Sequence, residues 1–182
     1  MEELTENIED IIRDAYKIAL SNEDIERVCE GRINVISYED LDNFTDSLED
    51  LFYPYGVVII LIQWRQNFGH WITLIDHNYT GNGNYLEQFD PFGSFFDAQF
   101  EKSNPYGLTK QLTRLFLNSD YDYTQFNIHR FQDIKNNTCG RWAIVRALCK
   151  DRNLDEFTDL FDNQELALEP DFYITAITLF SS

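Results

Sequence analysis

The sequence predicts a single α+β domain in which helices enclose a group of strands. Strand-like segments gather between residues 57 and 131, and most helical segments lie before and after them, so the two types are segregated rather than strictly alternating. The 182 residues fit one domain, and a 43% apolar content is enough for a core and argues against disorder. We expect an acidic helical part over 1–52, a core over 55–150 and closing helices over 151–182.

The first part of the chain reads as helical. Apolar residues recur at helical spacing over 6–19 and share one face. Ser21 then opens a capping-box pattern that predicts a second, short helix. Two smaller helical pieces are expected at 38–43 and 46–52.

Four strands are expected in the core. The run of β-branched residues over 57–62 is typical of a strand buried on both faces. Residues 71–75 and 85–89 read as strands on either side of turn-forming residues, which predicts a β-hairpin. A fourth strand is expected over 126–131.

Four helices are expected after the hairpin, at 106–117, 139–150, 154–161 and 170–180. The helix at 139–150 is strongly apolar, which indicates a buried position. Pro170 suits the first turn of the last helix.

The charge distribution excludes one class of function. The chain holds 32 acidic and 14 basic side chains, for a net charge of −18, and residues 1–50 carry −12 of it. Nucleic-acid binding depends on neutralising phosphates, so we expect no nucleic-acid partner and no affinity for anionic membranes. The acidic N-terminal part is either a solvated layer or a docking face for a basic partner.

The chain also lacks the marks of a membrane, secreted or zinc protein. The longest apolar run, 57–62, has strand length, and Met1–Leu4 offers no basic start of a signal peptide. Three cysteines without metal-ligand spacing, Cys29, Cys139 and Cys149, predict free thiols in a reducing compartment.

Cys139 is the strongest candidate for a reactive group. It follows a polar loop and opens an apolar helix, where the helix dipole and unpaired N–H groups favour a thiolate. Gly140 after it allows close backbone approach of a substrate. Cys29 and Cys149 lie among apolar residues of other helical segments and are expected to be structural.

His70 is the candidate base, because it stands at the entry to the 71–75 strand, where a side chain is held rigidly yet exposed. His77 and His129 are expected at the surface or at an edge.

Asp90 is the candidate acid, and the hairpin loop decides whether it reaches His70. A loop over 78–83 pairs Asp90 with Trp71, beside His70. A two-residue turn instead pairs Asp90 with Ile75, about 16 Å from His70. The function therefore needs the longer loop.

Two further polar residues complete the set of candidates. Asp76 is an alternative acid, but it lies six residues along the strand from His70, about 20 Å away. Gln132, expected at the end of the fourth strand, can donate its amide to an oxyanion together with the backbone N–H of Cys139.

The order and spacing of these residues resemble the adenain-like cysteine proteases, relatives of the ubiquitin-like-protein proteases. The matching segments are Gly69-His70-Trp71, Phe89-Asp90-Pro91-Phe92-Gly93, Gln132 and Thr138-Cys139-Gly140-Arg141-Trp142. The acid-Pro-Phe-Gly turn and the Gln-to-Cys step look like the viral maturation proteases. The Cys-Gly-Arg-Trp context and residues 36–51 look like proteases of virophages and related self-synthesising transposons. The resemblance covers roughly residues 55–150.

The resemblance implies a papain-like or adenain-like fold, with a small mixed central sheet and the nucleophile at the start of a central helix. It assigns Cys139 as nucleophile, His70 as general base and then acid, Asp90 as the orienter of His70 and Gln132 as oxyanion donor.

The resemblance also implies a substrate site and a biological role. Trp71 and Gly140 would line a narrow cleft for substrates with Gly at the cut. The role would be cleavage of viral capsid or other structural precursors during virion maturation, by a monomer without metal or organic cofactor. It would act in the virion and in the viral factory of the host cytoplasm, and would not be secreted.

Two alternatives use the same machinery: a protease of ubiquitin-like modifiers and an acetyltransferase of the same clan. Adenain works with DNA and a basic peptide, and a net charge of −18 argues against DNA here. A basic activating peptide stays open.

Overall fold

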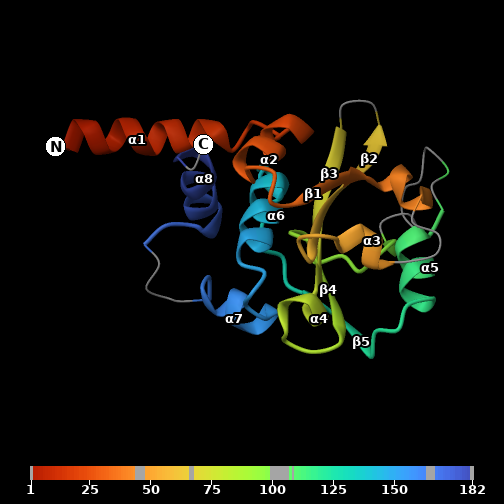
Figure 1. The fold of residues 1–182 in the computed structure, drawn as a ribbon. Coiled ribbons are helices and arrows are strands. Elements are labelled where there is room, and N and C mark those ends of the chain that lie inside the picture. The colour runs from red at the N-terminus through yellow and green to blue at the C-terminus, as the bar shows by residue number, and fades with distance from the viewer. Residues whose placement is uncertain are drawn as a thin grey trace.

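A computed structural model describes residues 2–43, 48–65, 68–98, 107, 109–162 and 167–180. A five-stranded mixed sheet in the order β1-β2-β3-β4-β5 forms the centre of the molecule (Figure 1). The strands are β1 (Asn34–Ser37), β2 (Val57–Arg65), β3 (Phe68–Asp76), β4 (Tyr85–Phe89) and β5 (Tyr123–Phe126). The two outer pairs are parallel and the two inner pairs antiparallel. The predicted mixed sheet flanked by helices is confirmed.

Helices lie on both sides of this sheet and beyond one end of it. They are α1 (Glu2–Ala15), α2 (Asn22–Val28), the 3-10 helix η1 (Tyr38–Asn43), α3 (Leu48–Phe52), α4 (His77–Thr80), α5 (Gln111–Leu117), α6 (Cys139–Leu148), α7 (Leu154–Asp159) and α8 (Pro170–Phe180). In Figure 1, α1 projects away from the sheet and packs against α8, while α6 lies between α8 and the sheet.

The β2 strand is buried on both faces, as its β-branched run predicts. Val57 and Ile59 pack with α2 and α6 on one face, and Val58 and Ile60 pack with η1, α3 and α5 on the other. Successive side chains of a strand point to opposite faces, so a continuous apolar run serves two cores at once. The helix that begins at Cys139 therefore packs against a fully buried part of the sheet.

The β3–β4 hairpin has a register that differs by one residue from the predicted one. Thr73 pairs with Phe89, and continuing this register sets Asp90 opposite Ile72 rather than Trp71. The connection between β3 and β4 contains the helical turn α4, which Asp76 caps by accepting the N–H groups of Asn78 and Tyr79. Opposite residues share a face and side chains alternate, so this register turns Asp90 to the side of His70, whereas the predicted one would turn it to the other face.

Three other expectations need correction. The β1 strand was not expected, because its four residues are too few for a clear pattern. The last strand covers 123–126 instead of 126–131. The helix expected at 106–117 begins at Gln111; residues 99–106 and 108 lie outside the described part of the chain.

The remaining elements follow the prediction closely. Ser21 forms the expected capping box with Asp24, and α8 begins at Pro170. The short helix expected at 46–52 covers 48–52, and residues 46 and 47 lie outside the described part. Among the described residues, no helix is both long and apolar enough to cross a membrane.

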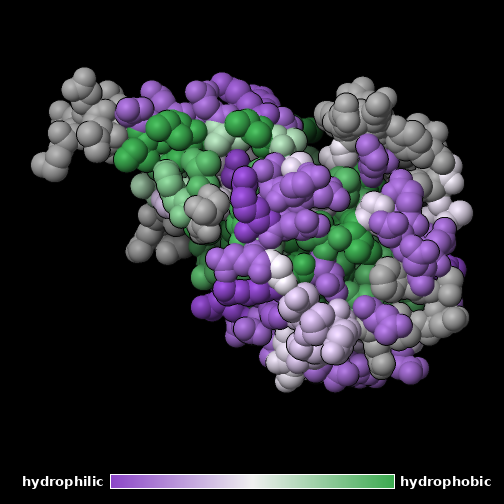
Figure 2. Space-filling model, turned by 45° about the horizontal axis from the view of Figure 1, so that its top comes forward, coloured by the Kyte–Doolittle hydropathy of each residue, from purple (hydrophilic) through white to green (hydrophobic). Residues whose placement is uncertain are grey.

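Apolar side chains remain exposed on the arm formed by α1 and α8. Ile8 and Ile11 of α1 and Ile177 and Phe180 of α8 are all more than 40% exposed. Figure 2 shows this hydrophobic surface beside the hydrophilic outer side of α1.

Candidate active site

The candidate site lies where β4 leaves β3. Pairing between the two strands ends at Thr73 and Phe89, so His70 lies three residues beyond the last pair. Asp90 follows β4 directly, and its Oδ1 is 2.6 Å from Nε2 of His70. Both side chains are buried, with 2% and 1% of their surfaces exposed. Asp76 instead caps α4, so Asp90 is the acid that meets His70.

The protonation of His70 reflects opposing influences. Burial is the largest and works against the imidazolium, but the charge and hydrogen bond of Asp90, together with Cys139, outweigh it and raise the pKa of His70 to about 10. A hydrogen bond between His70 and Cys139 contributes to this rise. Because Asp90 occupies Nε2, Nδ1 is the ring nitrogen that can exchange a proton with the thiol. The structure thus brings His70, Asp90 and Cys139 together.

The turn after β4 orients both members of the acid–base pair. Asp90 Oδ1 also accepts a bond of 2.7 Å from the backbone N–H of Phe92. The Phe92 ring stacks on the imidazole, with centroids 4.7 Å apart and planes 20° apart. At Gly93, with φ of +73°, a Cβ atom would lie 2.8 Å from the carbonyl oxygen of Ile128, so the turn packs directly on the 128–129 backbone.

Asn127 is a buried residue of the site that the sequence analysis missed. Its Oδ1 accepts the backbone N–H of Asp90 at 2.9 Å, and its Nδ2 donates to the carbonyl oxygen of Asp90 at 2.6 Å. The side chain thus continues β4 by one hydrogen-bonded pair beyond the end of β5. A lone Asn within an expected strand gives no signal of this role.

Gln132 lies in the loop before Cys139 rather than at the end of a strand. Its backbone N–H donates to the carbonyl oxygen of Pro91 at 3.2 Å, which ties it to the turn that carries Asp90. Its Nε2 donates to the carbonyl oxygen of Asn136 at 2.5 Å. One hydrogen of the Gln132 amide is used in this bond, and the second remains to be donated to an oxyanion.

Cys139 is the first residue of α6, as expected, and is 8% exposed. The hydroxyl of Thr138 donates to Asp171 at 2.8 Å and makes no capping bond to the helix. The N–H groups of the first helical turn have no partner within the helix, so they and the dipole favour negative charge at this position.

The other two cysteines lie in different surroundings. Burial raises the pKa of Cys29 to about 12, and burial also raises the pKa of Cys149, against the opposing charge of Arg146.

Trp71 and Gly140, the expected substrate-site residues, are packed against each other. Both are buried, and a Cβ atom at Gly140 would lie 3.1 Å from the Trp71 ring and 3.2 Å from Leu20 Cβ. The Trp71 indole donates to the carbonyl oxygen of Leu20 at 3.2 Å. Because Gly140 has no side chain, Trp71 and Leu20 can pack closely against the start of α6.

His77 is not at the surface, contrary to expectation. It is fully buried and bonds to Glu87 at 2.8 Å, while Glu87 also accepts two bonds from Arg146 of α6. Burial works against the charge of Glu87, but these partners outweigh it and lower its pKa. His129 is exposed, as expected, although it lies in a loop. The Glu87 group fastens the far end of α6 to β4.

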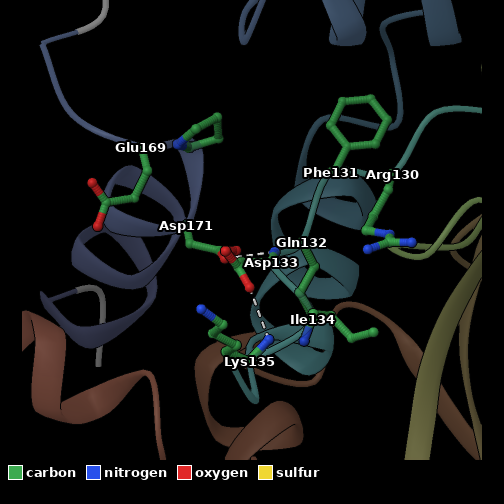
Figure 3. A pocket seen from close by; sticks show the side chains of 9 residues that line it. Arg130, Phe131, Gln132, Asp133, Ile134, Lys135, Glu169 and Asp171 are labelled. Carbon is green, nitrogen blue, oxygen red and sulfur yellow. Dashed lines mark hydrogen bonds between the residues drawn. The ribbon is translucent and has the colours of Figure 1, made fainter.

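A polar pocket of about 480 Å³ lies between residues 130–135 and the start of α8 (Figure 3). Gln132 lines it, but His70, Asp90 and Cys139 do not. The pocket therefore adjoins the loop that carries Gln132 without including the other three catalytic candidates. Within the described ranges, no group of three or more His, Cys, Asp or Glu side chains suits a metal ion.

Comparison with known protein families gives no match. Among curated proteins, the chain is 29% identical over 174 residues to "Uncharacterized protein V9" of Sputnik virophage, which covers 90% of this chain and 95% of that protein. Among solved structures, the central domain of the Lpg1148 protein from Legionella pneumophila matches 87% of each chain at 16% identity, but its TM-score of 0.37 is too low to establish a shared fold. The similarity to the Sputnik protein supports a virophage origin for the chain.

Proposed function

We propose that the chain is a cysteine endopeptidase of the adenain-like type, which cleaves viral structural precursors at Gly-containing sites during virion maturation. The observation that carries the proposal is the convergence of His70, Asp90 and Cys139, from three separate segments of the chain, with Gln132 in the loop before the thiol. Similarity to a virophage protein supports a viral substrate.

The proposed reaction proceeds through an acyl-enzyme. The Cys139 thiolate, paired with the His70 imidazolium that holds the thiol proton, attacks the peptide carbonyl, and the Gln132 amide and the Cys139 N–H stabilise the resulting oxyanion. His70 then gives its proton to the leaving amine, and the thioester remains. A water molecule, deprotonated by His70, releases the acid product and restores the thiol. Asp90 holds the imidazole in orientation throughout.

The test is cleavage of the capsid precursor and other structural precursors encoded in the same genome. Wild-type protein should cut them at Gly-containing sites, and Cys139→Ala should abolish cutting because no other group replaces the nucleophile. Cys149→Ala is the matched control and should leave turnover within about two-fold, since its thiol lies outside the site. Full turnover by Cys139→Ala would exclude the mechanism.

A second arm of this assay separates the alternative substrate class. A folded ubiquitin-like modifier with a Gly-Gly tail is offered under the same conditions. Faster cleavage of the modifier than of every viral precursor would show that the substrate assignment is wrong while the chemistry stands.

A further inference from the structure

Asp171, in the first turn of α8, is a buried carboxylate whose partners all lie in one segment. It is 2% exposed, and its two oxygens accept four hydrogen bonds from residues 133–142. The donors are Asp133 N–H (2.9 Å), Asn136 Nδ2 (2.7 Å), Thr138 Oγ1 (2.8 Å) and Trp142 Nε1 (2.7 Å). Figure 3 shows Asp171 reaching from α8 towards Asp133 across the polar pocket.

These four bonds span the segment that carries both oxyanion donors. Residues 133–138 form no helix or strand, so side-chain contacts must define their path. Asn136 connects Asp171 to Gln132 directly, because its Nδ2 donates to Asp171 while its carbonyl oxygen accepts the Gln132 amide. Thr138 connects Asp171 to the other oxyanion donor, because its hydroxyl donates to Asp171 and it immediately precedes Cys139.

We propose that Asp171 is the positioning residue of the oxyanion site: it fixes the Gln132 amide and the Cys139 N–H relative to each other. This inference rests on the proposed function. None of the hydrogen bonds described for Asp171 reaches His70 or Asp90, so Asp171 acts on oxyanion stabilisation and not on the thiol–imidazole pair. A misplacement of about 1 Å in such a group costs roughly 10²-fold in rate.

An amide cannot replace this carboxylate. All four partners are donors, and in either orientation the NH₂ of an Asn side chain would face two of them. Asp171→Asn therefore keeps the size of the side chain while disturbing the loop.

The experiment compares two reactions of Cys139 in the same variant. Proteolysis passes through a tetrahedral oxyanion, whereas alkylation by iodoacetamide does not. In Asp171→Asn, kcat should fall about 10²-fold with KM within about two-fold, and the alkylation rate of Cys139 should stay within about two-fold of wild type. A parallel loss of alkylation and proteolysis, or an unchanged kcat, would overturn the proposal.

Asp97→Asn is the matched control. Asp97 is also 2% exposed and accepts bonds from Tyr38 Oη (2.6 Å) and the Thr113 N–H (2.9 Å), away from the site. It should lower the melting temperature without the selective loss of kcat. An equal, selective loss of kcat in both variants would mean that Asp171 is merely structural.

A milder variant keeps the proposal testable if Asp171→Asn does not fold. Thr138→Val removes one of the four bonds and should lower kcat about 10-fold with unchanged alkylation; normal kcat would contradict the proposal. Wild-type protein that is alkylated at Cys139 but cuts no substrate would instead refute the proposed function, so the two failures are distinguishable.

Discussion

At the residue scale, the imidazole of His70 lies between an acid and a thiol, and its protonation defines the pH range of the site. Its pKa of about 10 lies above the value of about 6.5 for an unfolded histidine, so the native state binds the proton more tightly. The stability gained is complete below about pH 6.5 and is lost as the pH rises through 10. His70 therefore keeps the proton that the leaving amine needs at pH values below about 10.

Asp90→Asn should move the alkaline limit of activity. Asp90 raises the pKa of His70 by charge and by hydrogen bonding, so its loss should shift the alkaline limb of kcat/KM down by about 1–3 pH units. A pH–rate profile measures this shift. The melting temperatures of wild type and variant should differ more at pH 6 than at pH 10. An alkaline limb that stays in place would show that Asp90 does not govern the imidazole.

The three thiols should differ sharply in reactivity. Burial raises the pKa of Cys29 to about 12 and also raises that of Cys149, so both are protonated at neutral pH, while Cys139 lies beside the His70 imidazolium. One equivalent of iodoacetamide at pH 7 should label Cys139 first, as read by peptide mass spectrometry. His70→Gln should slow that labelling. Labelling of Cys149 ahead of Cys139 would contradict the assignment.

The candidate residues differ in how well a sequence reveals them. His70, Asp90, Gln132 and Cys139 are recognisable because each stands in a short pattern at the border of a strand or helix. Asn127 and Asp171 act through hydrogen bonds to segments distant in the chain, and nothing local marks a single Asn or Asp as such a contact. The candidate catalytic side chains were therefore predictable from local patterns, and the residues that hold them in place were not.

At the element scale, the hairpin shows why a register is hard to predict from turn residues. The predicted register came from counting the residues of a plain loop between the two strands. In the structure Asp76 caps the helical turn α4 within that connection, and the pairing of β3 with β4 is shifted by one residue. That single step decides which face Asp90 occupies. The four-residue β1 and the placement of β5 depend on pairing with β2 and β4, which local patterns do not contain.

The turn that carries Asp90 should be sensitive to a single methyl group. In Gly93→Ala the new Cβ would lie 2.8 Å from a backbone oxygen at φ of +73°, so we expect about 2–4 kcal/mol of destabilisation and a lower kcat. Gly81→Ala is the matched control, because Gly81 has φ of +80° with nothing within 4 Å of the new atom. It should cost only about 1–2 kcal/mol and leave kcat unchanged. Equal losses of stability by urea unfolding would mean that the contact with 128–129 is not tight.

At the scale of the whole molecule, half of the acidic side chains lie in the first 50 residues, which form α1, α2, β1, η1 and the start of α3. Residues 1–50 hold 16 acidic and 4 basic side chains, and α1, which packs on α8, covers Glu2–Ala15. Glu169, the residue before α8, pairs with Arg13 of α1 at 2.7 Å. Helix α1 and the segment 133–138 held by Asp171 therefore both contact the N-terminal end of α8.

This charge distribution predicts that duplex DNA does not stimulate the proposed proteolysis. DNA affinity arises from neutralised phosphates, and a chain of net charge −18 repels a polyanion more strongly as the salt is lowered. The measurement is the rate of cleavage of an uncharged peptide substrate, with and without duplex DNA, at low salt and at about 0.15 M salt. An uncharged substrate is needed because DNA would sequester a basic one. The rates should agree at both salt concentrations; stimulation that fades with added salt would reveal a basic surface strong enough to overcome the net charge.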